Sequence, residues 1–389
     1  MSTNYFSSNF TLGILGGGQL GKMLLQETRK WDIQTKVLDP SPDAPSRLAC
    51  SLFEQGNLMD YETVFNFGKT VDLLTIEIEN VNIDALEALE KEGVTVYPSS
   101  DSLRSIANKG TQKLFYTDHQ IPTAPFNRFA YSSEIEDSIA HGGLSFPFVW
   151  KSAQFGYDGQ GVKVVRQAAD LKGLPNVACI TESLIDFEKE LAVIVCRNPS
   201  GESVHYPVVE MEFHPEANQV EYVLCPARIT DHLAQKAIEV ALKTSEAYGH
   251  VGLLAVEMFL TKEGDILVNE VAPRPHNSGH YSIEGSYTNQ YEQHLRAILD
   301  LPLGDTASKV AAVMVNLVGA AGHTGAVVYK NMKHILSLDG VTPHIYGKKE
   351  TRPFRKMGHV TIVHPDMKTA REMAETVKKS IAVISENKI

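Results

Sequence analysis

LLAVEMFLTKEGDILVNEV occupies residues 253–271. Two apolar runs, Leu253–Leu260 and Ile266–Val271, flank the polar tetrapeptide KEGD, and this pattern predicts two strands joined by a tight turn. A hairpin centred between the Glu and the Gly of that tetrapeptide places Glu257 directly opposite Glu270. The Cβ atoms of such opposed residues lie about 4.5–5.5 Å apart. The sequence therefore predicts two neighbouring carboxylates within otherwise apolar strands.

These opposed glutamates indicate a cation site. Like charges at that separation destabilise a sheet unless something neutralises them. Hard divalent cations prefer carboxylate oxygens, and a pair of carboxylates that holds Mg²⁺ against nucleotide phosphates is a recurring arrangement. The alternative is that Glu257 and Glu270 are solvent-facing acids on the outer face of a sheet.

A glycine-rich loop upstream of this hairpin predicts a phosphate contact. The sequence GYDGQG at Gly156–Gly161 lies between two β-rich runs, Phe146–Ser152 and Val162–Arg166, and Lys151 lies in the first of them. Backbone N–H groups in such a loop can close over phosphates. For the loop alone, an ordinary hairpin turn explains the glycines equally well, but the lysine on the preceding strand favours nucleotide binding.

The first hundred residues alternate strand and helix patterns. Thr11–Leu15 predicts a strand, the glycine turn Gly16–Gly21 follows, and Lys22–Lys30 predicts a helix. This βαβ rhythm is typical of an open parallel sheet with helices on both faces. The later elements predicted in this part are strands at Gln34–Leu38, Val71–Ile76 and Val94–Tyr97 and a helix at Ile83–Lys91.

The turn GGGQLG at 16–21 matches the GxGxxG pattern of dinucleotide-binding folds, and Asp39 follows at the position of a ribose-binding acid. A nicotinamide-dependent dehydrogenase is therefore an alternative. However, any tight turn from strand to helix favours glycine, and no later segment suggests a hydride-transfer site. A Rossmann-like domain that binds another ligand is the better interpretation.

Composition narrows the classes of protein further. The chain has 389 residues, 43% hydrophobic and 21% charged, with a net charge of −11. Such an acidic surface repels polyanions, which argues against nucleic-acid or membrane binding. We expect a cytoplasmic protein, because no secretory signal or membrane-length apolar run is present. The four cysteines (Cys50, Cys179, Cys196 and Cys225) are widely spaced, as expected in a reducing compartment.

Later segments complete the predicted organisation. A helix is expected around Ser102–His119, and near the end we expect strands at Val310–Leu317 and Val360–Val363 and a helix at Thr369–Ser385. The predicted domains are a Rossmann-like domain at 1–108, a lid at 109–185, a core with the metal and nucleotide site at 186–303, and a small C-terminal subdomain at 304–389.

Together these features resemble the ATP-grasp superfamily and, within it, the N5-carboxyaminoimidazole ribonucleotide synthetases. The resemblance covers nearly the whole chain and implies an α/β fold, α+β in its later domains, with an ATP-grasp core behind the parallel-sheet domain. It rests on GGGQLGKM at 16–23, TIEIENV at 75–81, IPTAPF at 121–126, GYDG at 156–159, NEVAPRPHNSGH at 269–280 and RKMGH at 355–359.

The resemblance also implies which residues form the site. The implied nucleotide contacts are Lys109, Lys151, Gly156, Tyr157, Asp158, Gly159, Gln160, Gly161, Glu182, Ser183, Leu184, Ile185, Glu190, His214, Asn269 and Glu270. The implied metal ligands are Glu257 and Glu270. The implied substrate contacts are Gln19, Leu20, Glu79, Tyr157, Asp158, Arg274, His276, Lys348, Arg355 and Lys356. The chain departs from the family pattern at Gln160, where Arg or Lys is common, and at His214, which is displaced by one residue.

The activity that the resemblance implies is carboxylation of 5-aminoimidazole ribonucleotide with ATP and bicarbonate through carboxyphosphate. Asp158, Arg274 and His276 are the implied catalytic residues, and Asp158 is placed to take the amine proton. The implied cofactors are ATP and two Mg²⁺ ions, with Mn²⁺ as an alternative, and the implied assembly is a homodimer. The rival interpretations are a formate-dependent ribonucleotide transformylase, a biotin carboxylase, and a nucleotide sensor without catalysis.

A basic run near the end predicts a site for the 5′-phosphate of the ribonucleotide. Five basic residues and one acid lie between Gly347 and His359, in a chain whose total charge is −11. Arg355 and Lys356 are the expected contacts and Lys348 the third, since guanidinium and ammonium groups bind phosphate strongly. The alternative is a solvated surface turn.

Overall fold

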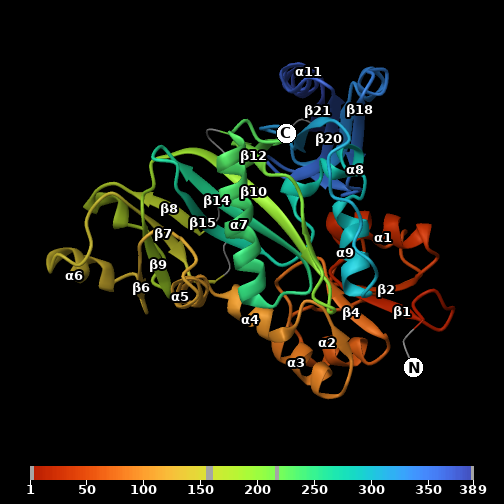
Figure 1. Ribbon diagram of the computed structural model, residues 1–389, viewed down its shortest axis with the longest axis horizontal. Helices are drawn as coiled ribbons and strands as arrows, with labels where there is room; N and C mark the ends of the chain where they lie inside the picture. The colour runs from red at the N-terminus through yellow and green to blue at the C-terminus, as the bar shows by residue number, and fades with distance from the viewer. Residues whose placement is uncertain (1–3, 155–160, 215–218, 387–389) are drawn as a thin grey trace.

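The computed structural model describes residues 4–154, 161–214 and 219–386. Its N-terminal part is an open sheet of five parallel strands in the order β3-β2-β1-β4-β5, which confirms the predicted parallel sheet (Figure 1). Its elements are β1 (Thr11–Leu15), α1 (Gln19–Lys30), β2 (Gln34–Asp39), β3 (Leu52–Gln55), α2 (Tyr61–Gly68), β4 (Leu73–Ile76), α3 (Ile83–Lys91) and β5 (Thr95–Val96).

Strand β1 is buried on both sides because its side chains alternate between two cores. Ile14 packs in a cluster with Leu24 of α1, whereas Leu15 packs with Val64 of α2 and Leu86 of α3. Helices therefore cover both faces of the parallel sheet, as its continuous apolar strands require.

The segment after this sheet differs from its prediction. One helix was expected around Ser102–His119, but the structure has two, α4 (Ser100–Ala107) and α5 (Lys109–Asp118). Asn108 is extended and separates them, and its side chain accepts hydrogen bonds from the N–H groups of the first turn of α5. This cap places Lys109 at the first position of α5.

A four-stranded antiparallel sheet, β6-β9-β7-β8, follows and lies to one side of the molecule (Figure 1). Its inner face is apolar: Phe148, Trp150 and Val165 pack against Ile135 of α6. The elements are β6 (Phe126–Phe129), α6 (Glu134–Ala140), β7 (Phe148–Ser152), β8 (Val162–Val165), the 3₁₀ helix η1 (Ala168–Leu171) and β9 (Cys179–Ser183).

The centre of the molecule is a nine-stranded sheet with the order β15-β14-β10-β12-β13-β16-β20-β18, and β11 pairs with β10. Helix α7 packs on it through Ala237 and Ala241 against Leu191 and Val256. The elements are β10 (Phe187–Arg197), β11 (Ser203–His205), β12 (Val209–Phe213), β13 (Val220–Cys225), α7 (Asp231–Tyr248), β14 (Gly252–Thr261), β15 (Ile266–Ala272), the 3₁₀ helix η2 (Asn277–Gly279), α8 (Ser282–Gly285) and α9 (Gln290–Ile298).

The C-terminal segment continues the central sheet, because β16 pairs with β13 and β20 pairs with β16. The predicted helix at Thr369–Ser385 is too long: the helix ends at Ser380 and a strand follows. The elements are β16 (Ala311–Val318), β17 (Gly325–Lys330), α10 (Met332–Ile335), β18 (Val341–Ile345), β19 (Glu350–Thr351), β20 (Lys356–His364), α11 (Met367–Ser380) and β21 (Ala382–Ser385).

Within the part of the chain that the structure describes, no helix combines the length and the apolar composition needed to cross a bilayer. All four cysteines carry free thiols, and Cys179, Cys196 and Cys225 are buried. These three behave as small core residues.

Candidate functional site

Glu257 and Glu270 are opposed residues of β14 and β15, which confirms the predicted pairing. The register shifts by one residue just beyond them, where Met258 pairs with Val268. Asn269 is therefore the extra residue of a β-bulge. Its side-chain oxygen accepts a hydrogen bond from Lys151 Nζ at 2.8 Å. The bulge thus brings an amide group into the site of the two carboxylates.

The two carboxylates differ in their protonation equilibria. Burial raises the pKa of Glu257, and the charges of Glu270 and Glu190 raise it further. Lys109 Nζ lies 2.7 Å from Glu270 Oε2, and this ammonium holds the pKa of Glu270 below its usual range. Among the described residues, Lys109 neutralises Glu270, and no lysine pairs with Glu257. Glu257 therefore binds a proton readily, and a metal ion at this pair would take the place of that proton.

A magnesium ion fits this donor set. Glu257 and Glu270 offer the carboxylate oxygens that hard cations prefer. Over residues 4–154, 161–214 and 219–386, no group of three or more His, Cys, Asp or Glu side chains is arranged to hold a metal by itself. Two carboxylates leave most of the six Mg²⁺ positions to phosphate oxygens and water, which is usual where the ion binds together with a nucleotide.

A buried ion-pair network holds Lys151 beside these carboxylates. The oxygens of Glu182 lie 2.7 Å from Lys113 Nζ and 2.7 Å from Lys151 Nζ, and all three side chains are less than one-tenth exposed. Burial opposes ionisation of Glu182, but the two ammonium groups hold its pKa below the usual range. Burial also lowers the pKa of Lys113 to about 8. The Glu182 side chain is thus already paired in this structure.

Lys113 was missed in the sequence. The available signal was its spacing, since it lies four residues after Lys109 and so on the same face of α5. What the spacing could not reveal was its partner: Glu182 belongs to β9 of another sheet. Lys113 also donates to Thr123 Oγ1, whose hydroxyl donates to the backbone oxygen of Val268 at 2.7 Å.

The remaining predicted nucleotide contacts lie at the end of β9, on β10 and just after β12. Burial raises the pKa of Glu190, on β10, to about 7. Leu184 and Ile185 are half-buried directly after β9, and the exposed Ser183 ends that strand. His214 directly follows β12 and packs edge-on against Phe354, with ring centroids 5.9 Å apart. His214 therefore lies beside the basic run near the C-terminus.

Arg274 and His276 lie on an irregular segment between β15 and η2. His276 Nε2 is 3.4 Å from Glu257 Oε1, and the N–H of Ser278 donates to His276 Nδ1 at 3.3 Å. This contact makes Nδ1 an acceptor, so in the neutral ring Nε2 carries the proton and faces the carboxylate. Arg274 Nη2 lies 2.8 Å from Glu79 Oε1. The segment thus links the carboxylate pair to the N-terminal domain.

The glycine turn before α1 binds a carboxylate of the chain itself. The N–H groups of Gly18 and Gly21 donate to Glu77 Oε1 and Oε2, each at 3.0 Å, and the N–H of Gly17 donates to Asp39 Oδ2 at 2.7 Å. A dinucleotide pyrophosphate would need these same N–H groups. The dehydrogenase interpretation therefore has no physical support in this structure.

The predicted contacts to the ribonucleotide come from both ends of the chain. Gln19 is half-buried and Leu20 buried at the start of α1, and Glu79 follows β4. Lys348 Nζ donates to the backbone oxygen of Lys356 at 2.7 Å. Lys356 starts β20, and its charge acts on both Glu257 and His280.

Arg355, the residue before that strand, is half-buried. Its Nη1 donates to the backbone oxygen of Glu350 at 2.6 Å. Of the predicted loop GYDGQG, Gly156, Tyr157, Asp158, Gly159 and Gln160 lie outside the described residues, while Gly161 precedes β8 with a φ of 75°.

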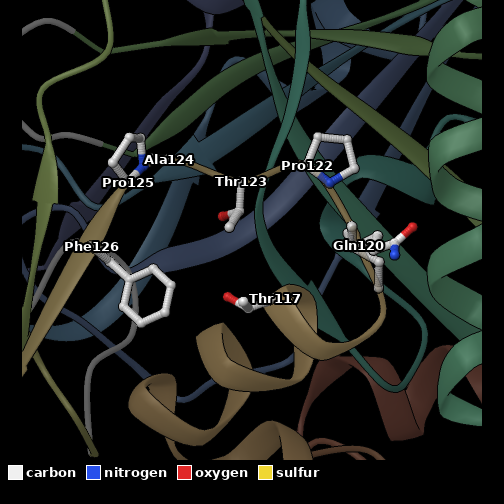
Figure 2. Close-up of a pocket in the computed structure, with 8 residues that line it drawn as sticks. Thr117, Gln120, Pro122, Thr123, Ala124, Pro125 and Phe126 are labelled. Carbon is white, nitrogen blue, oxygen red and sulfur yellow. The ribbon is translucent and has the colours of Figure 1, made fainter.

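A surface hollow of about 570 Å³ lies between the end of α5 and the segment that leads into β6. Figure 2 shows Thr117 on the helix below and Pro122 to Phe126 on the segment above. Its lining carries no acid, no base and none of the predicted site residues. The hollow therefore supplies no ionisable group, although Thr123 in its lining contacts Lys113 of the buried network.

Three family models match the chain in succession. They describe a ribonucleotide synthetase preATP-grasp domain at residues 10–107, an ATP-grasp domain at 114–291 and a phosphoribosylaminoimidazole carboxylase C-terminal domain at 312–373. A curated relative from Bacillus subtilis, named N5-carboxyaminoimidazole ribonucleotide synthase, is 35% identical over 367 residues, which cover 93% of this chain and 94% of the relative. The chain belongs to the N5-carboxyaminoimidazole ribonucleotide synthase family.

Solved structures agree with this family. The Thermotoga maritima N5-carboxyaminoimidazole ribonucleotide synthetase is 40% identical with a TM-score of 0.88, and the match covers 97% of this chain and 100% of that chain. An Aspergillus clavatus N5-carboxyaminoimidazole synthase, solved with ADP and 5-aminoimidazole ribonucleotide, is 32% identical with a TM-score of 0.86 and covers 95% and 98%. The predicted ATP-grasp fold and family are confirmed, and the transformylase and biotin carboxylase alternatives are not favoured.

Proposed function

We propose that this N5-carboxyaminoimidazole ribonucleotide synthase family member carboxylates the exocyclic amine of 5-aminoimidazole ribonucleotide, using ATP and bicarbonate and releasing ADP and phosphate. The observation that carries this proposal is the convergence of three sets of residues. Glu257 and Glu270 form the opposed carboxylates. Lys109 pairs with Glu270, and Lys151 binds the neighbouring Asn269. The segment with Arg274 and His276 connects the carboxylate pair to the N-terminal domain.

The lysines and the carboxylate pair suit the first half of this reaction. Bicarbonate is a poor electrophile, so an ATP-dependent ligase first transfers the γ-phosphoryl group to it. Lys109 and Lys151 would hold the phosphate oxygens and offset their charge. Glu257 and Glu270 would hold Mg²⁺, which when bound supplies Lewis-acid stabilisation of charge on the phosphoryl group. Two ions are proposed, and Mn²⁺ would suit the same oxygens.

The segment with Arg274 and His276 suits the second half. Arg274 would balance the negative charge of carboxyphosphate, and the Nε2–H of His276 would orient its carboxyl group toward the amine. The amine attacks the carboxyl carbon, the bond to phosphate breaks, and one amine proton must leave. Asp158 is the proposed acceptor of that proton, on the basis of its place in the GYDG motif.

The substrate assignment draws on the family. The Aspergillus clavatus relative was solved with ADP and 5-aminoimidazole ribonucleotide, which supports a nucleotide site and a ribonucleotide site in one chain. Gln19, Leu20 and Glu79 would contact the ribonucleotide from the N-terminal domain, while Lys348, Arg355 and Lys356 would bind its 5′-phosphate. Bicarbonate as co-substrate, the homodimer and a cytoplasmic location are further parts of this proposal.

One assay tests the proposal directly. ADP release is measured with MgATP and bicarbonate, in the presence and absence of 5-aminoimidazole ribonucleotide. We expect the ribonucleotide to stimulate ADP release and to be consumed in equal amount. Formate in place of bicarbonate should support no turnover. Stimulation by formate, or ADP release that the ribonucleotide leaves unchanged, would overturn the assignment.

A further inference from the structure

Among the described residues, the segment that carries Arg274 and His276 has one backbone hydrogen bond of its own, from the N–H of Gly279 to the His276 oxygen at 3.0 Å. Strand β15 ends at Ala272, and Pro273 and Pro275 follow. Proline has no N–H group, so neither residue can donate to a neighbouring strand and continue the ladder. An expected catalytic arginine and histidine therefore lie on a segment that needs support from elsewhere in the fold.

Gln290, the first residue of α9, supplies that support with its side chain. The N–H of His276 donates to Gln290 Oε1 at 2.9 Å, and Gln290 Nε2 donates to the backbone oxygen of His276, also at 2.9 Å. The side-chain amide thus binds both backbone groups of one residue, as a neighbouring strand would. Gln290 is completely buried, so water cannot replace these bonds without a rearrangement.

The orientation of this amide follows from its partners. The backbone N–H of His276 can only donate, so the atom that faces it must be the oxygen of Gln290. The nitrogen then also faces His280 Nδ1 at 3.0 Å. Burial holds the pKa of His280 well below its ordinary value, so the ring is neutral, and in the tautomer that carries its proton on Nε2 the Nδ1 atom accepts from Gln290. Every donor and acceptor group of the amide faces a suitable partner.

The two hydrogen bonds between the Gln290 amide and the backbone of His276 are called the clamp below, and the contacts around Gln290 leave it little freedom to move. A Cβ atom on Gly279 would lie 2.5 Å from Gln290 Oε1 and 2.3 Å from Ile194 Cδ1, so only glycine fits at that position. The N–H of Gln290 donates to Ser282 Oγ at 2.9 Å, and this hydroxyl donates to the backbone oxygen of Gly279 at 2.6 Å. Gly279 and Ser282 therefore hold the Gln290 side chain and its backbone in one position.

Helix α9 in turn is attached to the N-terminal domain, beside α1 (Figure 1). Asn289 caps α9 and donates to Glu27 Oε1 of α1 at 3.0 Å. Tyr291 packs in one core cluster with Leu20 and Met23 of α1. Gln290 thus lies where the proposed ribonucleotide contacts at the start of α1 meet the segment with Arg274 and His276.

We infer that Gln290 is a positioning residue for the proposed carboxylation: its amide fixes the backbone at His276 and thereby sets Arg274 and His276 relative to the ribonucleotide. The expected effect of Gln290 on turnover rests on the proposed function. Misplacement of reacting groups by about 1 Å can reduce a rate by roughly a hundred-fold, so a positioning residue can affect turnover strongly without touching substrate.

The chain contains a matched control for this inference on the same helix. Gln293 is also completely buried, and it binds both backbone groups of Gly304 in the same way, accepting from the N–H at 2.9 Å and donating to the oxygen at 3.2 Å. Gly304 lies in the connection between α9 and β16, and no site residue is predicted there. Gln290→Met and Gln293→Met therefore each remove a pair of hydrogen bonds to one residue's backbone, and Gln290→Met also removes the contact with His280, but only Gln290→Met removes a clamp on the site.

The first experiment compares these two variants. We expect both to lower the Tm by similar amounts. Gln290→Met should lower the kcat for ribonucleotide-dependent ADP release by roughly ten-fold or more, with the KM for ATP within about two-fold of wild type, whereas Gln293→Met should keep its kcat within about two-fold. Equal effects of both variants on kcat, or a normal kcat in Gln290→Met, would show that Gln290 acts as a structural residue alone.

A second variant gives a signature that a loss of stability cannot imitate. The carboxyl group introduced by Gln290→Glu can replace both hydrogen bonds to His276 when it is protonated, but when ionised it repels the backbone oxygen. We therefore expect the kcat of Gln290→Glu, relative to wild type, to rise as the pH falls, and that of Gln290→Met to stay low at every pH. A pH profile of Gln290→Glu that parallels wild type would contradict the inference.

Hydrogen exchange separates the clamp from the proposed activity. The His276 N–H is bonded to Gln290, so its exchange should be roughly ten-fold faster or more in Gln290→Met and unchanged in Gln293→Met. This result can be obtained even if wild-type protein shows no ribonucleotide-dependent turnover, an outcome that would overturn the proposed function and leave the clamp in place. Unchanged exchange at His276 in Gln290→Met would overturn the clamp itself.

Discussion

Glu257 and Glu270 face each other across β14 and β15, and Lys109 lies 2.7 Å from the second of them. The lysine neutralises Glu270, whereas burial and the charge of Glu270 raise the pKa of Glu257 to about 8, so a ligand cation would take the place of a proton there. This asymmetry explains how two opposed glutamates are tolerated within the sheet, and it makes the pair suitable for a metal–nucleotide complex.

The first prediction concerns this pair. Glu270→Gln removes the charge that faces both Lys109 and the proposed Mg²⁺, so turnover should fall below detection while the circular-dichroism spectrum stays that of wild type. Glu263→Gln is the control, because Glu263 is an exposed acid at the turn of the same hairpin. Near-normal turnover of Glu270→Gln at millimolar Mg²⁺ would exclude the proposed metal site.

The second prediction concerns the buried network. Lys113→Met leaves Glu182 with Lys151 as its remaining lysine partner, which draws Lys151 away from the phosphate site. The contact of Lys151 with the ATP phosphates is then lost. A charge-assisted hydrogen bond of this kind contributes about 1.5–3 kcal/mol, so the KM for ATP should rise roughly ten-fold or more. Steady-state kinetics with varied ATP test this, and Lys91→Met, which removes an exposed lysine on α3, should leave it unchanged. An unaltered KM for ATP in Lys113→Met would show that Lys151 keeps its position without this network.

The third prediction separates the two phosphate sites. Arg355→Ala should raise the KM for the ribonucleotide by roughly ten-fold or more and barely change the KM for ATP, because the proposed ATP site lies with Lys109 and Lys151. Arg352→Ala is the matched control, since Arg352 is exposed in the same basic run. If Arg355→Ala weakened ATP and spared the ribonucleotide, the assignments of the two phosphates would have to be exchanged.

The fourth prediction concerns acid stability. His294 donates to Thr75 and accepts from the N–H of Leu253, and His250 contacts Ser102 and the oxygen of Leu253. Burial lowers the pKa of His250 to about 4 and that of His294 to about 3. Below the ordinary pKa of about 6.5 the unfolded chain therefore binds protons that the folded chain excludes.

Stability should consequently be fully present above pH 6.5 and should fall as the pH drops from 6.5 toward 4. The measurement is the decrease in Tm between pH 7 and pH 5. His294→Gln should be less stable than wild type at pH 7, yet its Tm should decrease less on acidification, because one titrating group is gone. An equal decrease in both proteins would mean that His294 does not contribute to acid sensitivity.

Local pattern was enough to predict much of the site. Alternating strand and turn residues located β1 and the hairpin of β14 and β15, and the hairpin symmetry predicted that Glu257 and Glu270 are opposed. The predicted centre of the turn, between Glu263 and Gly264, is wrong, because Leu260 pairs with Ile266 and the turn is centred on Glu263. The bulge at Asn269 adds one residue to β15, so Glu257 and Glu270 are opposed nevertheless. The single helix expected around Ser102–His119 was wrong, because the cap formed by Asn108 competes with helix continuation, and helical periodicity alone does not reveal that competition.

Residues that are distant in the sequence decided the rest. The ladder of a hairpin joins neighbours in the chain, so the sequence by itself determined the carboxylate pair and, through its motifs, the family. The ion pairs of Lys113 and Lys151 with Glu182, the ion pair of Arg274 with Glu79, and the clamp of Gln290 on His276 join different elements. Only the tertiary structure decided these contacts, because a polar side chain can be satisfied by many partners, and packing selects which partner is present once water is excluded.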